Sequence, residues 1–334
     1  MTPATHDDFW AWWTTQGAAS CEAAIAAGTV ESLVDELTER VHAMSPDLVW
    51  ELGPGTTAQH RLVVSPEGNP DVRAVARRWL RAAPEPTDTW QYADARGADP
   101  DPGSGGIRVG GADVQFAEIR VGATRVGNHV DVAVHHPRLR ELPEQARGMV
   151  VFISLDHTLG ELECETWIGA VEVALDEPDD AVTLEGLREL VAAVRDDATD
   201  ADGGPTWVML QGEVDGRPLM AVAQVPLAPS FAPHLDTHLA VEVPFPATDE
   251  GFPDEGALDD LRAIEDHLTQ RLDDMARLVA HETGQGRRVL HYYADSARPV
   301  DGVAEAAVTG WTHGVVTVTR DADPGWHAVR HLRT

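Results

Sequence analysis

One short stretch of the chain, residues 155–172, concentrates side chains that could do chemistry. Its sequence is LDHTLGELECETWIGAVE, with one histidine and four glutamates within sixteen positions. Carboxylate oxygens suit a hard cation such as Mg²⁺ or Ca²⁺. His157, Glu161 and Glu163 are therefore the candidate metal ligands. A metal held there would serve a metal-assisted hydrolase built on the acidic cluster at 156–165.

The same stretch also fits a purely structural role, which we favour. If ELECETWIG is a strand, its side chains alternate between two faces, and neighbouring carboxylates on one face lie about 7 Å apart. That distance is too long for two carboxylates to hold one ion without a third group between them. We expect a hairpin that turns at Gly160 and pairs with the apolar run MVVFISL before it. Its acids would face solvent, with Leu162, Cys164 and Ile168 inward.

A second candidate site is the segment HETGQGRRVLHYYAD, which begins at residue 281 and has the pattern of a hairpin. Arginine and tyrosine are good contacts for a carboxylate or for a partner protein. The segment therefore predicts a binding surface for a protein or a small anion, the alternative being an ordinary surface hairpin. The candidate binding residues are His281, Thr283, Arg287, Arg288, His291 and Tyr293.

The helices and strands that we expect around these residues indicate an α+β protein of two domains. Residues 1–195 form the first, an antiparallel sheet with helices. Its opening helix, HDDFWAWWTTQG, carries tryptophans that we expect in the core. The Gly-, Pro- and Asp-rich segment 94–106 is expected to be a mobile loop without a catalytic role.

An acidic linker, residues 196–205, separates the second domain, residues 206–334. That domain opens with two strands around Asp215 and Gly216, a strong hairpin signal. Its remaining strands and helices follow the order βαββαβ, which predicts a ferredoxin-like fold.

Composition excludes several functions. The formal net charge of −31 repels phosphate backbones, so we expect no direct nucleic-acid binding. The chain has no lysine, which removes Schiff-base and phosphate-loop lysine chemistry. It also lacks a Walker loop, an HExxH motif and a GxSxG motif. We expect no cofactor and no membrane span, and an acidic N-terminus with only two cysteines predicts a cytoplasmic protein.

Several stretches resemble a known bacterial family, domain of unknown function 695. In the C-terminal half they are VEVPFPATDEGFPDEGALDDLRAIEDHL, HETGQGRRVLHYYAD and DADPGWHAVRHL. The segments FWAWW, SPEGNPDV and LDHTLGELECETWIG resemble the region that precedes that domain in uncharacterised proteins. The resemblance implies fold and kinship, and no activity.

We therefore predict a binding or regulatory module that acts through contacts with a protein partner. A metal-assisted hydrolase and a small-anion binding protein are the alternatives.

Overall fold

The computed structural model describes residues 6–201, 204–300 and 302–333. Helices and strands both contribute substantially, so the predicted α+β class is confirmed. Within the described ranges, no helix is both long and apolar enough to cross a bilayer.

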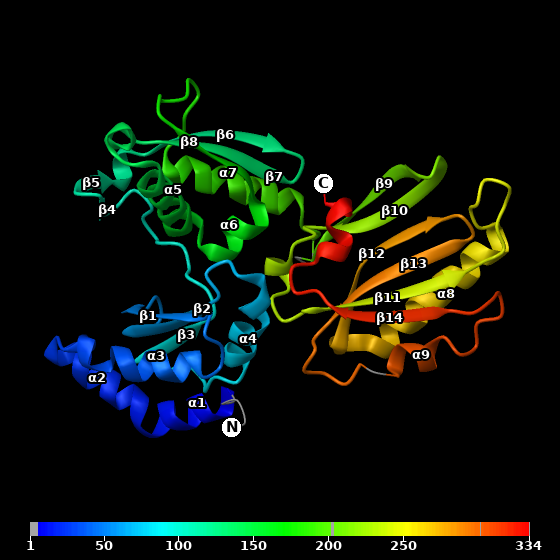
Figure 1. Cartoon of the computed structure of the whole chain (residues 1–334), viewed down its shortest axis with the longest axis horizontal. Helices are drawn as coiled ribbons and strands as arrows, with labels where there is room; N and C mark the ends of the chain where they lie inside the picture. Colours follow the sequence, from blue (N-terminus) through cyan, green and yellow to red (C-terminus); the bar gives the residue numbers. More distant parts are fainter. Residues whose placement is uncertain (1–5, 202–203, 301, 334) are drawn as a thin grey trace. The chain divides into compact units, whose positions relative to one another are not determined.

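The chain divides into two compact units (Figure 1). The N-terminal unit comprises residues 1–124 and 130–191, and the C-terminal unit comprises residues 125–129 and 192–334. The predicted linker at 196–205 falls near the beginning of the C-terminal unit. The independent folding of the predicted domains stays a prediction.

The first part of the chain, up to Asp197, is rich in helices. Its helices are α1 (His6–Trp12), α2 (Ala18–Ala27), α3 (Val34–His42), α4 (Pro70–Arg81), α5 (Glu144–Leu159), α6 (Glu161–Trp167) and α7 (Leu184–Asp197). Short π or 3₁₀ turns lie at Trp13–Gly17, Val30–Leu33, Phe116–Glu118 and Pro137–Glu141. Its strands are β1 (Val49–Pro54), β2 (His60–Ser65), β3 (Trp90–Ala93), β4 (Gly106–Val109), β5 (Ala112–Gln115), β6 (Arg120–Val126), β7 (His129–His135) and β8 (Ile168–Ala174).

The prediction of one antiparallel sheet in this part of the chain is wrong. The strands form three small sheets, in the orders β1-β2-β3, β4-β5 and β6-β7-β8. β2 is antiparallel to β1 but parallel to β3, and β7 is parallel to β8. Helices connect the parallel strands, α4 between β2 and β3 and α5 with α6 between β7 and β8. Such a crossover returns the chain in the same direction, which a tight hairpin cannot do.

An aromatic core joins the opening helices to the first sheet, as the tryptophans predicted. Phe9, Trp10, Trp13, Trp79 and Trp90 are all buried in one cluster. The rings of Trp10 and Trp79 stack at 4.7 Å between centroids, and the indole N–H of Trp10 donates to the Trp79 carbonyl oxygen at 2.7 Å. This packing ties α1 to α4 and so holds β2, which carries part of the site described below.

The prediction of a β-hairpin that turns at Gly160 is wrong, because the segments before and after the glycine are both helical. MVVFISL lies within helix α5, and ELECETW forms helix α6. The buried positions of α5 recur at helical spacing (Ala146, Val150, Val151, Ser154, Leu155, Thr158 and Leu159). The exposed positions Met149, Phe152 and Ile153 are also apolar. The run therefore has no visible period, and such a run does not distinguish a strand from a helix.

The C-terminal unit is built on one six-stranded sheet in the order β14-β11-β13-β12-β10-β9. Every neighbouring pair is antiparallel. Its strands are β9 (Thr206–Val214), β10 (Arg217–Val225), β11 (Thr237–Pro244), β12 (Ala276–Gly284), β13 (Arg287–Ala294) and β14 (Thr317–Ala322). Its helices are α8 (Glu255–Leu272), α9 (Val303–Ala307) and short 3₁₀ turns at Pro229–Phe231, Asp273–Met275 and His327–Leu332. The predicted hairpin turn is confirmed, because Asp215 and Gly216 join β9 to β10 with positive φ angles of 54° and 72°.

The two faces of this sheet have different covers. Helix α8 lies against one face, where Leu261, Ile264 and Leu268 share a core with Leu290 and Tyr292 (Figure 1). On the other face, Trp326, Val329 and Leu332 of the closing segment pack with Tyr293 and Ala221. The closing segment therefore covers part of the face that α8 leaves free.

Candidate functional site

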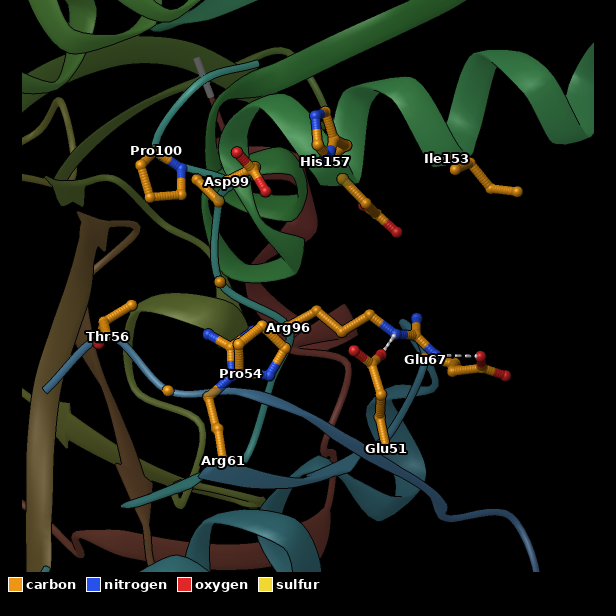
Figure 2. Close-up of a pocket in the computed structure, with 14 residues that line it drawn as sticks. Glu51, Pro54, Thr56, Arg61, Glu67, Arg96, Asp99, Pro100, Ile153 and His157 are labelled. Carbon is orange, nitrogen blue, oxygen red and sulfur yellow. Dashed lines mark hydrogen bonds and ion pairs between the residues drawn. The ribbon is translucent and has the colours of Figure 1, made fainter. Parts of the chain in front are cut away.

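A cavity of about 880 Å³ lies within the N-terminal unit. Figure 2 shows Glu51, Arg61 and Arg96 on one side of it, and Asp99, Ile153 and His157 on the other. These side chains come from three distant segments, the β1–β2 region, the loop after β3, and the last turns of α5. The full lining is Glu51, Pro54, Gly55, Thr56, Arg61, Glu67, Arg96, Gly97, Ala98, Asp99, Pro100, Ile153, Asp156 and His157.

Part of the loop that we expected to be mobile lines the cavity, and hydrogen bonds hold it in place. The guanidinium of Arg188 donates to the carbonyl oxygens of Thr158, at 2.7 Å, and Pro100, at 3.2 Å. The Asp99 N–H donates to the carbonyl oxygen of His157 at 2.8 Å. Gly160 has a φ of +79°, and a Cβ there would lie 2.9 Å from the Ala98 nitrogen. The loop therefore packs directly onto the junction between α5 and α6.

Arg96 organises one wall of the cavity by binding three carboxylates. It donates to Glu51 at 3.0 Å, Glu67 at 2.6 Å and Glu161 at 2.8 Å. Burial acts to lower the pKa of Arg96, but the hydrogen bonds and charges of its acidic partners outweigh burial and raise it. Arg96 is therefore a structural cation whose charge is already neutralised, so it is a poor candidate for binding an anion from solution.

Glu161 is the most deeply buried acid of the opening motif, at 5% exposed. The expectation that the acids of this motif face solvent is wrong for this residue. Its carboxylate accepts a hydrogen bond from the Ser65 hydroxyl at 2.7 Å in addition to that from Arg96. Burial raises the pKa of Glu161, while Ser65 and Arg96 oppose that effect. The carboxylate oxygens of Glu161 are therefore bound by other residues of the chain.

Two titratable groups of α5, Asp156 and His157, line the cavity, and the thiol of Cys164 on α6 lies close to Asp156. Burial raises the pKa of Asp156, and burial followed by the nearby charge of Asp156 strongly raises the pKa of the Cys164 thiol. Cys164 therefore stays protonated and is a poor nucleophile. The His157 ring packs on Phe116 with 4.4 Å between centroids, and its Nε2 is buried without a hydrogen-bond partner among the described residues.

Arg61 differs from Arg96 in having no acidic partner among the described residues. Its Nε is buried and bonds to no other side chain or backbone group in the described part of the chain. Arg61 lies on strand β2, and its guanidinium reaches Gly97, where an added Cβ would lie 3.4 Å from the Arg61 Nη1. A buried donor without a partner costs free energy unless a ligand or water satisfies it. Arg61 is therefore the group of this cavity best suited to bind an anion.

The structure does not gather the candidate metal ligands around one point. His157 lies in the cavity wall, and Glu161 is bound by Ser65 and Arg96. Glu163 is half-buried on α6. Across residues 6–201, 204–300 and 302–333, no group of three His, Cys, Asp or Glu side chains is placed to hold a metal ion.

The second candidate set, at the β12–β13 hairpin, is divided between the two faces of the sheet. On the α8 face, Arg288 donates to Thr283 at 2.9 Å and to Glu265 at 3.3 Å, and His281 lies 3.1 Å from the same Glu265. On the opposite face, the Tyr293 hydroxyl donates to Asp323 at 2.6 Å.

His291 also contacts Glu282, and Arg287 is an exposed residue 3.5 Å from Glu242. The six residues therefore form no single surface, and a binding role for any of them stays a prediction.

Comparison with known families finds a match for the C-terminal part of the chain. Residues 206–331 match the model of a family of unknown function, DUF695. The resemblance inferred from the C-terminal motifs is thus confirmed for that range. No curated protein and no solved structure matches the chain. We call the matched range, residues 206–331, the DUF695 region; the match supplies no activity.

The DUF695 region contains a hydrogen-bonded chain of histidines. Glu282 accepts from the Nε2 atoms of His291, at 3.0 Å, and His331, at 3.1 Å. Burial acts to raise the pKa of Glu282, but its hydrogen bonds to His291 and His331 outweigh burial and lower it, so it is ionised. His291 Nδ1 in turn lies 3.0 Å from His238 Nε2, so a hydrogen bond joins the two rings.

This histidine chain should make the DUF695 region less stable in acid. Burial, followed by the charge of His291, lowers the pKa of His238 from 6.5 to about 4. Between these two pH values the unfolded state binds a proton at His238 more readily than the folded state does. The contribution of His238 to the free energy of unfolding is therefore present above pH 6.5 and is lost as the pH falls to about 4. The full loss should be about 3 kcal/mol. Urea denaturation at neutral and acidic pH measures it.

His238→Gln should flatten this dependence, whereas His267→Gln, at an exposed position of α8, should leave it unchanged. An unaltered acid dependence in His238→Gln would assign the effect to other groups.

Proposed function

We propose that the N-terminal unit binds a small zwitterionic ligand of the amino-acid class in the cavity around Arg61. The observation that carries this proposal is the partly buried guanidinium of Arg61, which has no acidic partner in the described part of the chain. A planar guanidinium matches a carboxylate through two parallel hydrogen bonds.

The other charged residues that line the cavity are mainly acidic, which favours a ligand with a positive group at the end opposite its carboxylate. Asp99 and Asp156 line the cavity, while Arg96 is already bound by three glutamates. An anion without a compensating positive group would meet net negative charge there. Asp99 lies across the cavity from Arg61 (Figure 2), so one ligand with opposite charges at its two ends fits both. Ile153, an exposed residue that also lines the cavity, adds an apolar contact.

Ligand-induced stabilisation tests this function directly. The standard amino acids, acetate and butylammonium are the probes, each scored by its effect on the melting temperature and then by calorimetry. At least one amino acid should raise the melting temperature more than either single-charge probe. Arg61→Gln should weaken its binding about 10- to 100-fold, because one charge-assisted contact is lost.

The matched control is Arg108→Gln, at an exposed position outside the cavity, which should bind as the wild type does. If no amino acid stabilises the protein, or if Arg61→Gln binds equally well, the proposal is wrong.

A module that acts through protein contacts is our second proposal. It is favoured by the exposed apolar stripe Met149, Phe152 and Ile153 on α5, of which Phe152 is 61% exposed. Exposed apolar groups gathered in this way are typical of contact surfaces. In the β12–β13 hairpin, Arg288 and Arg287 already have the acidic partners Glu265 and Glu242, so we do not propose anion binding there.

For the C-terminal unit we propose a ferredoxin-like fold extended by one hairpin. The support is the order β14-β11-β13-β12, in which β13 separates β11 and β12, the two strands that α8 connects. The β9–β10 hairpin then adds two strands beside β12.

A further inference from the structure

Strand β9 is an edge strand with no neighbour beyond it among the described residues. It is nine residues long and pairs with β10 along its whole length, so its other side presents a row of backbone N–H and C=O groups. At the start of the strand, the Thr206 N–H already donates to the Ala198 carbonyl oxygen at 3.1 Å, so the open part of the edge follows Thr206. Long, regular edge strands associate readily, and proteins that stay monomeric protect them with charges, proline or a covering element.

β9 carries little of that protection. Its segment TWVMLQG, from Thr206 to Gly212, contains no charged residue and no proline. The opposite edge strand, β14, carries Arg320 and Asp321. The two edges of the same sheet therefore differ in the feature that controls edge-to-edge pairing.

The side chains of β9 point to the same conclusion. Leu210 packs against the buried cluster that contains Trp326. By strand alternation Trp207 and Met209 therefore face the other way, at 46% and 63% exposed. That is the α8 face, but neither β9 nor β10 contributes to the core that α8 covers. A tryptophan and a methionine thus lie uncovered beside an open strand edge.

We propose that two copies of this chain associate by antiparallel pairing of their β9 strands. A two-fold axis perpendicular to the sheet would join the two six-stranded sheets and bring Trp207 and Met209 of both copies together on one face. Each copy carries a formal charge of −31, so most of its surface repels a second copy. The uncharged segment of β9 is where two such molecules can meet without placing like charges opposite each other.

Sedimentation velocity and light scattering on the full chain test this pairing. The wild-type protein should reach twice the chain mass of 36.1 kDa as concentration rises. Added salt should tighten the dimer, because it screens the mutual repulsion.

Met209→Lys should shift the protein to monomer without changing its melting temperature at dilute concentration, because the side chain is exposed and the new charges would meet at the axis. The matched control is Val315→Lys, which places the same charge at a position 86% exposed and outside β9. It should dimerise as the wild type does.

Three outcomes would overturn the proposal. One is a wild-type protein that stays monomeric at every workable concentration, which would leave the edge to a different protein. Another is a dimer that Met209→Lys does not weaken. The third is a melting temperature that Met209→Lys lowers in the dilute monomer, because that result would mean another part of the same chain covers β9.

Discussion

Replacing Trp13 by alanine should lower the free energy of unfolding by about 3–5 kcal/mol. The side chain is only 1% exposed, and its ring meets Trp90 edge-on at 4.9 Å between centroids. Its indole N–H donates to the Tyr92 hydroxyl at 2.9 Å. Truncation therefore leaves a large cavity and leaves the Tyr92 hydroxyl without its donor. The cavity should persist, because the surrounding core is closely packed and cannot collapse fully into it.

Denaturation followed by far-ultraviolet circular dichroism measures this change. If the two units unfold in separate transitions, only one transition should shift. Trp207→Ala, compared at dilute concentration, is the matched control, because that indole is half exposed and its loss should cost less than about 1 kcal/mol. Equal effects from the two substitutions would contradict the packing described for the aromatic core.

The second large effect is expected at Arg96. Arg96→Ala should destabilise the protein by about 2–4 kcal/mol at neutral pH, since it leaves a buried carboxylate without its cation. We place the loss below that of a fully buried pair, because a third of the Arg96 side chain is exposed. Most of the effect should come from Glu161, since Glu51 and Glu67 are about half exposed.

The pH dependence of this loss identifies its cause. Burial already raises the pKa of Glu161, and removing Arg96 should raise it further. The variant's deficit relative to the wild type should therefore shrink as pH falls through the pKa of Glu161 and grow as pH rises above it.

Adding Glu161→Gln to Arg96→Ala should recover part of the stability, because no buried charge remains. Arg125→Ala, which breaks an exposed pair with Asp197, should cost less than about 1 kcal/mol. A deficit in Arg96→Ala that does not change with pH would assign the loss to packing instead.

Much of the C-terminal unit follows from local sequence signals. The Asp215-Gly216 pair specifies a hairpin turn because both residues adopt positive φ. Helix α8 begins where Asp254 accepts from the Ala257 N–H at 2.8 Å, and its buried positions recur at helical spacing. These elements are hydrogen-bonded to sequence neighbours, or form hairpins with them, so their order was predictable.

The site was less predictable, because no single segment contains it. Arg61 and Arg96 are separated in sequence by strand β3 and helix α4, and His157 follows much later. An arginine in the acidic loop DARGADPDP was a usable signal, since in a lysine-free chain it is a scarce cation beside many acids. Nothing local distinguishes Arg96, which binds three carboxylates, from Arg61, for which the described part of the chain offers no acidic partner.

By itself the sequence determined the α+β class, the hairpin and element order of the DUF695 region, the aromatic core of the N-terminal unit, and a strongly acidic surface. These features depend on residue type and short-range spacing. Only the tertiary structure decided that residues 149–159 and 161–167 are helical. It also decided that β3 pairs in parallel with β2 and β8 with β7, and that three distant segments line one cavity. The physical reason is that an apolar run or an alternation of Glu with apolar residues satisfies both helix and strand locally. The surfaces that bury each side chain choose between them, and those surfaces come from remote parts of the chain.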